Sequence, residues 1–417
     1  MRSLSILISL AVGILCAMLT PNILAQEAID YEYMSVPIGG GGYITGMKIH
    51  PTNSDVRYYR TDIGGAYRWN AATQRLEQII YATEPQRDYF GVAGIALDPN
   101  NENRVILAVG RKCDLFQSAI LESYDRGQSW TVYESPVYFA SNGGRECSDG
   151  TDKDRQGSPI VLNPANPDEL FIGSRGEGLW RLNFSNDLFT RIAQNIIPSN
   201  TTRKSIRSVL FHPVDTTKVF ISYIDHGIYR GDLSTGIYEK VSGNILQLNE
   251  TSDLSFSATG SYLFAACKKS GIYRCDNPLD ITPSWSMVLP YAGTDPIGEG
   301  FLTVTAHPTL DEVVATVYGD WSQIDNFRIS QNFGALNSWV EHDGNLQTNI
   351  YPHRTLGHGS HISQIAFDPN APDHLYFTSW FTTTQTTNWD VPTIQWSNAE
   401  SRGHEEVVIT DVSAFTT

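Results

Sequence analysis

The stretch Ile49-His50-Pro51, followed shortly by Val56-Arg57-Tyr58-Tyr59, decides the fold because it recurs along the chain. Each copy holds an apolar run, a turn of His, Asp or Asn before Pro, a short polar stretch and a second apolar run. Proline fixes the backbone angle φ, and Asp or Asn caps a turn, so each copy predicts a bend between two strands. The other copies are Asp98-Pro99, Asn163-Pro164, His212-Pro213, Ser257-Ala258 (a degenerate copy without Pro), His307-Pro308 and Asp368-Pro369.

Seven copies lie between His50 and Asp368, most of them about 46 to 49 residues apart and two at longer intervals of about 61 and 65. A period near this length, with four short strands per unit, is typical of a β-propeller. One small sheet cannot bury both of its faces, whereas sheets packed radially bury them against one another. The sequence therefore predicts an all-β fold, a seven-bladed β-propeller, in which a strand near Tyr31–Val36 completes the seventh blade.

Two further patterns fall inside the repeat. A third strand is indicated by Ala66-Tyr67-Arg68-Trp69 and by similar runs at 179–181, 228–230 and 272–274. The run from Ser123 to Trp130 reads S-x-D-x-G-x-x-W, an Asp-box, and 330–339 is a degenerate copy. We expect Asp125 to accept backbone N–H bonds in its turn and Trp130 to pack between sheets, which is a structural role.

The N-terminus has the pattern of a secretory signal peptide. Arg2 precedes an apolar run from Leu4 to Leu19, Pro21 breaks the run, and Ile23-Leu24-Ala25 is a plausible cleavage site. An uncleaved membrane anchor is the alternative. We expect a signal peptide at 1–25, the propeller at 26–402 and a C-terminal strand or stub at 403–417. The mature chain is then extracellular, and periplasmic or on the cell surface if the source is bacterial.

Composition narrows the partners. The net charge is −16, from 29 basic and 45 acidic residues, so the chain should repel nucleic acid and anionic membranes. Hydrophobic residues make up 41% and charged residues 18%, which suits a large buried core. We expect a monomer that needs no cofactor and no metal, and that contacts no membrane beyond its signal peptide.

Four cysteines follow the signal segment, namely Cys113, Cys147, Cys267 and Cys275. Export permits disulfides, and four cysteines allow three connectivities. Cys267 and Cys275 flank a predicted hairpin and could face each other across it, while Cys113 and Cys147 would join neighbouring loops. Four free thiols are the alternative.

The most distinctive segment combines Gly39-Gly40-Gly41-Gly42-Tyr43 with the run from Arg60 to Trp69, which begins Arg60-Thr61-Asp62-Ile63-Gly64-Gly65. The glycines allow close approach of the backbone to a partner. Asp62 precedes a Gly pair that leaves its carboxylate with little cover. It is either a cap of the turn or a general acid or base.

These two segments together resemble the opening blade of glycoside hydrolase family 74, the xyloglucanases. That family carries a nearly identical string of glycines, H-P and R-T-D-I-G-G-A-Y-R-W. Further similarity follows at Gly91–Pro99, through the Asp-box, and at Gly173–Trp180. The resemblance spans most of residues 36–410 and is densest before about residue 185.

The resemblance implies a secreted hydrolase of xyloglucan or a related plant or algal β-glucan. The family inverts configuration with two Asp residues, of which the one in R-T-D-I-G-G, here Asp62, is the general base. The acid lies on a second propeller in a G-D-x-G-G-F-like motif, and we find no such motif before Thr417. Inversion needs a second carboxyl about 6.5–9.5 Å from the first. Glu177, Asp225 and Asp320 are the first residues to consider, because they come at comparable points of their own repeats.

Four aromatic residues are candidates to stack on sugar rings. Tyr43 and Tyr67 flank Asp62, Tyr89 precedes the second blade, and Trp321 matches a position where the family places a subsite aromatic. Aromatic faces bind pyranose faces through dispersion and CH–π contact. Packing in the core is the alternative for each ring.

A second cluster stands outside the resemblance. His353, Arg354, His358 and His361 fall within nine residues. Histidine can remove the C5 proton of a uronate while a cation neutralises its carboxylate, which is the chemistry of a polysaccharide lyase. A polar loop before the last blade is the alternative. Single-propeller lyase or glycosidase activity, and glycan binding without catalysis, therefore remain rival hypotheses to family-74-like hydrolysis.

Overall fold

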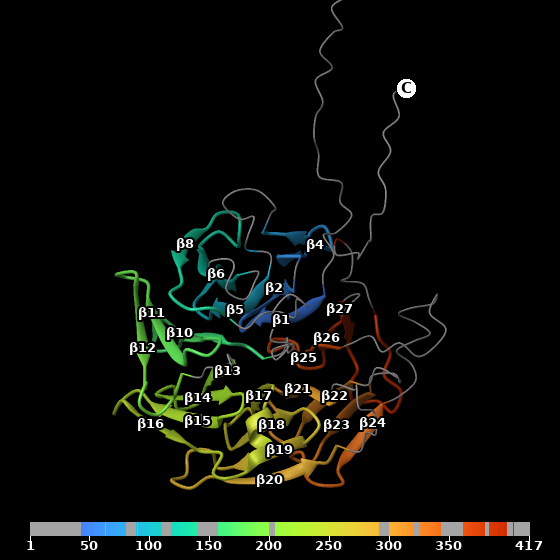
Figure 1. Ribbon diagram of the computed structural model, residues 1–417. Coiled ribbons are helices and arrows are strands. Elements are labelled where there is room, and N and C mark those ends of the chain that lie inside the picture. The colour runs from blue at the N-terminus through green and yellow to red at the C-terminus, as the bar shows by residue number, and fades with distance from the viewer. Residues whose placement is uncertain are drawn as a thin grey trace, which may run out of the picture. The chain divides into compact units, whose positions relative to one another are not determined.

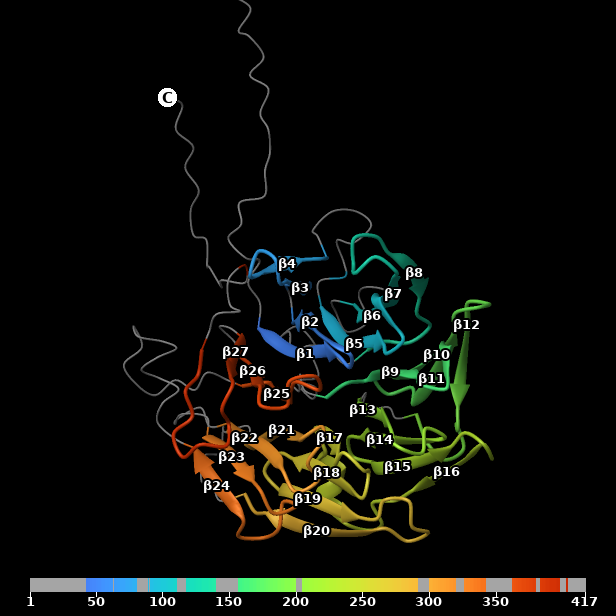
Figure 2. The ribbon, with the colours of Figure 1, turned by 180° about the vertical axis from the view of Figure 1, so that it is seen from behind.

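The computed structural model describes residues 43–62, 64–80, 89, 91–110, 118–139, 157–199, 205–291, 300–319, 326–342, 362–379, 383–397 and 403. All of them belong to one compact unit, residues 38–417. They form seven antiparallel sheets arranged in a ring, as Figures 1 and 2 show from opposite sides. The prediction of a seven-bladed β-propeller is confirmed. The predictions made for the signal segment and for a strand near Tyr31–Val36 lie outside the described residues.

Six blades have four strands each, hydrogen-bonded in chain order. The first three blades are β1 (Ile44–His50), β2 (Asn53–Thr61), β3 (Ala66–Asn70), β4 (Arg75–Gln78); β5 (Val92–Asp98), β6 (Asn101–Val109), β7 (Ala119–Ser123), β8 (Thr131–Glu134); β9 (Ile160–Asn163), β10 (Asn166–Gly173), β11 (Leu179–Asn183) and β12 (Leu188–Ile192). The next three are β13 (Ile206–Phe211), β14 (Lys218–Tyr223), β15 (Gly227–Asp232), β16 (Ile237–Lys240); β17 (Asp253–Phe256), β18 (Tyr262–Cys267), β19 (Gly271–Asp276), β20 (Ser284–Leu289); β21 (Gly300–Ala306), β22 (Val314–Gly319), β23 (Asn326–Ser330) and β24 (Trp339–His342). A short 3-10 helix, η2 (Leu246–Glu250), precedes the fifth blade.

The seventh blade contains β25 (Gln364–Phe367), β26 (Leu375–Thr378) and β27 (Thr383–Thr386). Its described part is extended on the outer side by a bridge between Gln385 and Ser397, whose backbone groups exchange two hydrogen bonds of 2.8 Å. The residues that follow β27 therefore cover its outer edge at this point.

The repeated His/Asp/Asn-Pro turn lies between the first and second strands of its blade, as predicted. Its polar residue is buried, and in the two copies with His50 and His212 it joins one blade to the next. The His50 ring donates to the carbonyl of Asp98 (2.9 Å), and the His212 ring donates to the carbonyl of Gly260 (3.2 Å). Asn370, beside the seventh turn, donates to the carbonyl of His50 (2.9 Å) and so ties the last blade to the first.

Seven hydrophobic clusters in the described part of the chain each bridge two neighbouring blades. The cluster that closes the ring joins Ile44, Met47, Tyr59 and Tyr67 of the first blade to Tyr376 of the seventh. Burial of apolar surface contributes about 25 cal/mol per Å² removed from water. The core is therefore distributed between sheets, and every blade depends on both of its neighbours.

The turn at 123–130 has the contacts that its sequence predicts. The Asp125 carboxylate accepts the backbone N–H groups of Gln128 (2.9 Å) and Ser129 (2.8 Å). The Trp130 indole donates to the carbonyl of Ile79 in the preceding blade (3.2 Å). Trp285 and Trp339 make the equivalent bond to the blades before theirs, at 3.0 and 3.1 Å. These tryptophans fasten the outer edges of adjacent blades.

The predicted pairing of Cys267 with Cys275 is wrong. Both thiols are free and buried. They sit on adjacent strands, but the register pairs Cys267 with Gly271 and Cys275 with Leu263, so the two cysteines are not cross-strand partners. Burial raises the pKa of each thiol to about 12. Cys113 and Cys147 lie outside the described residues.

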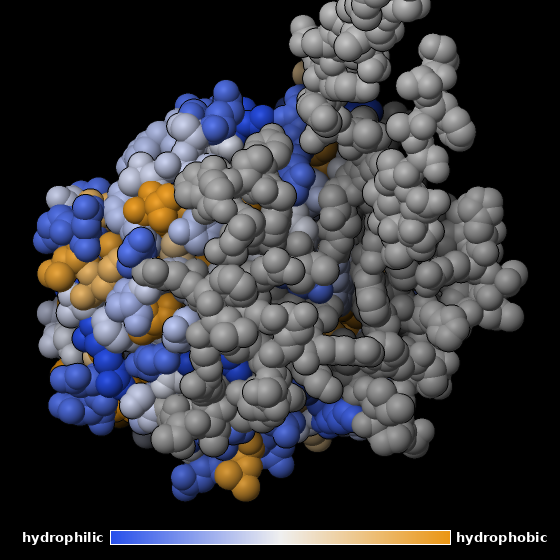
Figure 3. Space-filling view, turned by 45° about the horizontal axis from the view of Figure 1, so that its top comes forward, coloured by the Kyte–Doolittle hydropathy of each residue, from blue (hydrophilic) through white to orange (hydrophobic). Residues whose placement is uncertain are grey.

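Large apolar side chains at the surface are scattered along the outer strands. Leu188, Ile237, Met287 and Val340 are exposed, each on the fourth strand of its own blade. On the face seen in Figure 3, hydrophobic residues form small groups between hydrophilic ones, which is usual for a protein surface. No helix in the described ranges is long and apolar enough to cross a bilayer.

Arg104 in β6 is buried between the second and third blades. It is 3% exposed, and it bonds to Glu122 (2.6 Å), Asp98 (3.0 Å) and the carbonyl of Pro167 in the third blade (2.9 Å). The ring of Phe184 lies 4.9 Å from its guanidinium carbon. Arg104 therefore neutralises two buried carboxylates and links the second blade to the third.

We expect Arg104→Ala to lower the free energy of unfolding by about 3–5 kcal/mol, because it leaves two buried carboxylates without their cation. Urea denaturation followed by tryptophan fluorescence measures this loss. Arg328→Ala is the matched control, since the Arg328–Glu341 pair is 26% and 36% exposed and should cost at most about 1 kcal/mol. Equal losses in the two variants would contradict the assignment.

The free thiols give a second prediction. Under native conditions at pH 8, iodoacetamide should leave Cys267 and Cys275 unmodified, because both are buried and protonated. In denaturant without reductant, both should be alkylated, as peptide mass spectrometry would show. Recovery of a disulfide-linked peptide containing both residues would refute the assignment of two free thiols.

Candidate functional site

Asp62 lies in the turn between β2 and β3. Thr61 fixes this turn through its hydroxyl, which accepts the N–H of Gly64 (2.7 Å) and donates to the carbonyl of Gly65 (2.8 Å). Gly65 has φ +80°, and a Cβ there would meet Ile80 of the same blade. The second Gly of the pair is therefore required by the backbone, and Asp62 projects from a rigid turn.

The Asp62 carboxylate is half-buried and oriented by the chain segment that leads into β1. Its Oδ1 accepts the backbone N–H of Tyr43 (2.9 Å), and its own N–H donates to the carbonyl of Tyr43 (3.1 Å). The Oδ1 bond joins Asp62 to the segment before β1 and not to a backbone N–H of its own turn, which Thr61 holds. The two bonds to Tyr43 also hold the carboxylate in one direction, which a general base requires.

The same turn recurs in three other blades. Counted from Thr61 or its equivalent, each turn has five residues and ends in a glycine of positive φ that directly precedes or begins the third strand. These glycines are Gly65, Gly178, Gly227 and Gly271, with φ of 80°, 86°, 95° and 109°. In the third blade Ser174 takes the place of Thr61, accepting the N–H of Glu177 (3.0 Å) and donating to the carbonyl of Gly178 (2.7 Å). A glycine directly before the third-strand run is thus a signal in the sequence from which this recurring turn could have been predicted.

The four turns differ at the position of Asp62. Arg175 and Ile224 donate their backbone N–H to the carbonyls of Tyr138 (2.7 Å) and Ser205 (3.2 Å), as Asp62 does to Tyr43. Lys268 follows the end of β18 in the same way. The fold accepts Arg, Ile or Lys at this point, so the carboxylate of the first blade is not required for the turn.

Glu177 and Asp225 do not occupy the place of Asp62. Glu177 corresponds to Gly64, and Asp225 comes one residue after Ile224, which takes the place of Asp62. Burial raises the pKa of Glu177, against the opposing effect of Arg175 and Arg191. Burial lowers the pKa of His226, whose ring centroid lies 4.4 Å from that of Tyr223. Asp320 lies outside the described residues.

Two of the four candidate sugar-stacking rings are buried. Tyr67 is fully buried in the cluster that joins the first and seventh blades, and Tyr43 is 4% exposed. Neither presents a ring face to solvent, which agrees with the alternative of packing in the core. Their closeness to Asp62 in the sequence did not reveal which side of the strand they occupy. Tyr89 is half-buried and packs against the cluster between the first two blades.

Trp321 and the second cluster, His353, Arg354, His358 and His361, lie outside the described residues. Within the described ranges, no group of three or more His, Cys, Asp or Glu is placed to hold a metal.

Arg60, two residues before Asp62, has a structural role that the sequence did not reveal. It is 4% exposed and reaches from β2 across the ring, donating to the carbonyls of Thr45 (3.3 Å), Ala93 and Gly157 (2.6 Å). Burial lowers the pKa of its guanidinium to about 10, with Asp253 opposing the shift. Arg60 therefore ties the strand that carries Asp62 to the second and third blades.

Comparison with known proteins bears on this site. No family model matches the chain. Over 154 residues, 36% of this chain and 18% of the relative, it is 39% identical to an oligoxyloglucan-reducing end-specific xyloglucanase of Emericella nidulans. Over 164 residues, 38% of this chain and 18% of the relative, it is 34% identical to a xyloglucanase of Acetivibrio thermocellus. The matched segment is thus less than a fifth of either relative.

Among solved structures, the fold is similar to a GH74 xyloglucanase from Xanthomonas campestris, with a TM-score of 0.72 and 21% identity over 89% of this chain. It is also similar to a GH74 enzyme of Niastella koreensis, with a TM-score of 0.68 and 22% identity over 88% of this chain. The chain covers 56% and 55% of these two proteins. The resemblance to family 74 inferred from the opening blade is therefore confirmed, and the structural likeness extends to the whole propeller.

The equivalence of the two best-described turns can be tested by stability. Thr61→Val and Ser174→Ala each remove a buried hydroxyl that bonds two backbone groups. We expect each to lower the free energy of unfolding by about 1–3 kcal/mol, since a buried donor loses its partner. Guanidinium denaturation measures both. A loss in only one variant would mean that the turns are not equivalent.

Proposed function

We propose that the chain is a glycoside hydrolase acting on xyloglucan or a related plant or algal β-glucan, with Asp62 as general base. The observation that carries the proposal is the Asp62 turn. It holds a half-buried carboxylate in one direction at a position where the equivalent turns carry Arg175, Ile224 and Lys268. The names of the relatives, which are xyloglucanases, supply the substrate class.

In an inverting hydrolase the base removes a proton from the water that attacks the anomeric carbon. A second, protonated carboxyl donates to the departing glycosidic oxygen. The pKa of Glu177 is raised by burial, which favours the protonated form, yet Glu177 stands at the place of Gly64 and not of Asp62. We therefore assign only the base within the described residues.

We propose that the chain works outside the cytoplasm as a monomer. The support is the charged and apolar pattern of residues 2–25 and the location of plant and algal polysaccharides outside the cell. A neutral glucan also suits a protein whose net charge is −16, because the substrate carries no charge for the protein to repel.

Asp62→Asn tests the proposal. We expect the release of reducing ends from xyloglucan to fall about 10²- to 10⁴-fold, because the amide cannot accept a proton. Thr61→Val should also reduce turnover, since it loosens the turn that carries Asp62. Ser174→Ala should lower the stability as much as Thr61→Val does, but it should leave turnover unchanged. This pair separates an effect on the site from an effect on folding.

The assay is made on the chain alone and with a separately produced second propeller of a xyloglucanase. Absence of reducing ends in both arms for the wild type would overturn the proposal. Ultraviolet absorbance of an unsaturated product from uronate glycans would instead support a lyase. Retardation in affinity electrophoresis without turnover would indicate a binding protein.

A further inference from the structure

A cavity of about 570 Å³ occupies the centre of the ring, away from Asp62. It is lined by the first strands of all seven blades and by prolines of the repeated turns, among them Pro51, Pro99 and Pro213. Tyr43, which binds Asp62, precedes β1, whereas Pro51 follows its end. A strand of seven residues is about 20 Å long, so the cavity and the Asp62 turn are at opposite ends of the strand.

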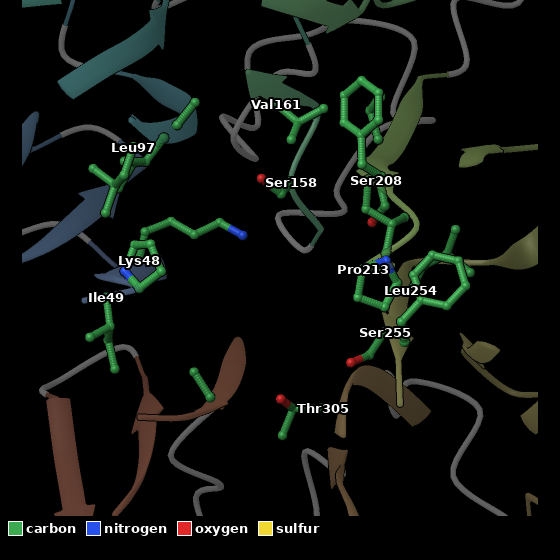
Figure 4. A pocket seen from close by; sticks show the side chains of 18 of the residues that line it. Lys48, Ile49, Leu97, Ser158, Val161, Ser208, Pro213, Leu254, Ser255 and Thr305 are labelled. Atoms are coloured by element: carbon green, nitrogen blue, oxygen red, sulfur yellow. The ribbon is translucent and has the colours of Figure 1, made fainter. Parts of the chain in front are cut away.

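The ammonium of Lys48 points into this cavity (Figure 4). Within the described residues, no hydrogen bond or ion pair reaches it. Burial lowers the pKa of Lys48, and the nearby Arg60 adds to that effect, while Asp253 opposes it. Lys48 is half-buried by accessible surface, so its ammonium is partly desolvated and gains from any acceptor that enters the cavity.

Asp253, the neighbouring carboxylate, is occupied by other donors. Its Oδ1 accepts from Ser208 (3.3 Å) and the N–H of Leu254 (2.9 Å), and its Oδ2 accepts from Thr303 (3.0 Å) and the N–H of Val304 (3.3 Å). Burial raises its pKa to about 6. Asp253 therefore bonds to its own blade and to both neighbouring blades, and it leaves the Lys48 ammonium facing the cavity.

The remaining wall is largely apolar with a few hydroxyls. Figure 4 shows Ile49, Leu97, Val161 and Leu254 around the same space as Lys48. Hydroxyls that border it belong to Ser158, Ser208, Ser255 and Thr305. One cation, several hydroxyls and an apolar wall are complementary to a singly charged group on an apolar body. The volume falls in the range of about 300–1,000 Å³ of small-molecule sites.

We propose that the central cavity binds a small organic carboxylate, with its carboxylate group on the Lys48 ammonium and its apolar body against Ile49, Leu97 and Leu254. A multiply charged ion such as phosphate is less well matched, because it would need more donors than one ammonium and would gain nothing from the apolar wall. This site is separate from the Asp62 turn and does not depend on the proposed hydrolysis.

Binding can be tested by calorimetry with benzoate and with benzamide, which has the same shape without the charge. We expect benzoate to bind one site, and benzamide to bind about 10- to 100-fold more weakly, since a charge-assisted bond contributes about 1.5–3 kcal/mol. Lys48→Met should weaken benzoate binding by a similar factor. Lys240→Met is the matched control, because Lys240 is exposed on β16. The Lys240→Met variant should bind benzoate as tightly as the wild type does.

Wild-type protein provides a second measurement in case Lys48→Met folds poorly. Reductive methylation with formaldehyde, read by peptide mass spectrometry, reports the access to each lysine. Benzoate should protect Lys48 and leave Lys240 unprotected, and benzamide at the same concentration should protect Lys48 less. Absence of saturable benzoate binding, equal affinities for the two probes, unchanged binding in Lys48→Met, or unprotected Lys48 would each overturn the proposal.

Discussion

The structure depends on one constraint: each four-stranded sheet has two apolar faces and can bury them only against its neighbours. The seven clusters between blades meet this requirement. Hydrophobic contact alone does not fix the angle between two sheets. The directional hydrogen bonds of the buried polar residues in the repeated turns fix that angle. His50, His212 and Asn370 each satisfy a backbone carbonyl of an adjoining blade. A buried carbonyl without a partner is costly, so these bonds select one arrangement of the ring.

This packing also places ionisable side chains at both ends of the ring. The strands of every blade alternate in direction, so the turns between second and third strands share one end of the ring and the proline turns share the other. The first end carries Asp62, Glu177 and Asp225. The second borders the cavity into which Lys48 points. The length of one short strand therefore separates the Asp62 end of the ring from the cavity end. Residues at either end can differ between blades without disturbing the hydrophobic clusters.

The fold was predictable from the sequence because its signals are local. A His-Pro or Asp-Pro turn, and the Ser123–Trp130 turn, make their bonds within a few residues or to the adjacent blade. The sequence was a poor guide where the result depends on the direction of a side chain or on the register of a hairpin. Tyr67 adjoins Asp62 in sequence but faces the seventh blade, and Cys267 pairs with Gly271 because the hairpin is shorter than the cysteine spacing suggests. Glu177 matched Asp62 by position in its repeat, and only the hydrogen bonds of the turn show that it replaces Gly64.

The orientation of Asp62 shows why local sequence could name the residue and not its geometry. Asp62 is bound to Tyr43, whose neighbour Ile44 donates to the carbonyl of Ser379 in the seventh blade (3.3 Å). Two residues before Asp62, Arg60 is bound to carbonyls of the second and third blades. Four blades therefore determine where one carboxylate points. A single opening blade can encode the turn, but the direction of its carboxylate is set only once the last blade has closed against the first. The role proposed for Asp62 therefore depends on closure of the ring.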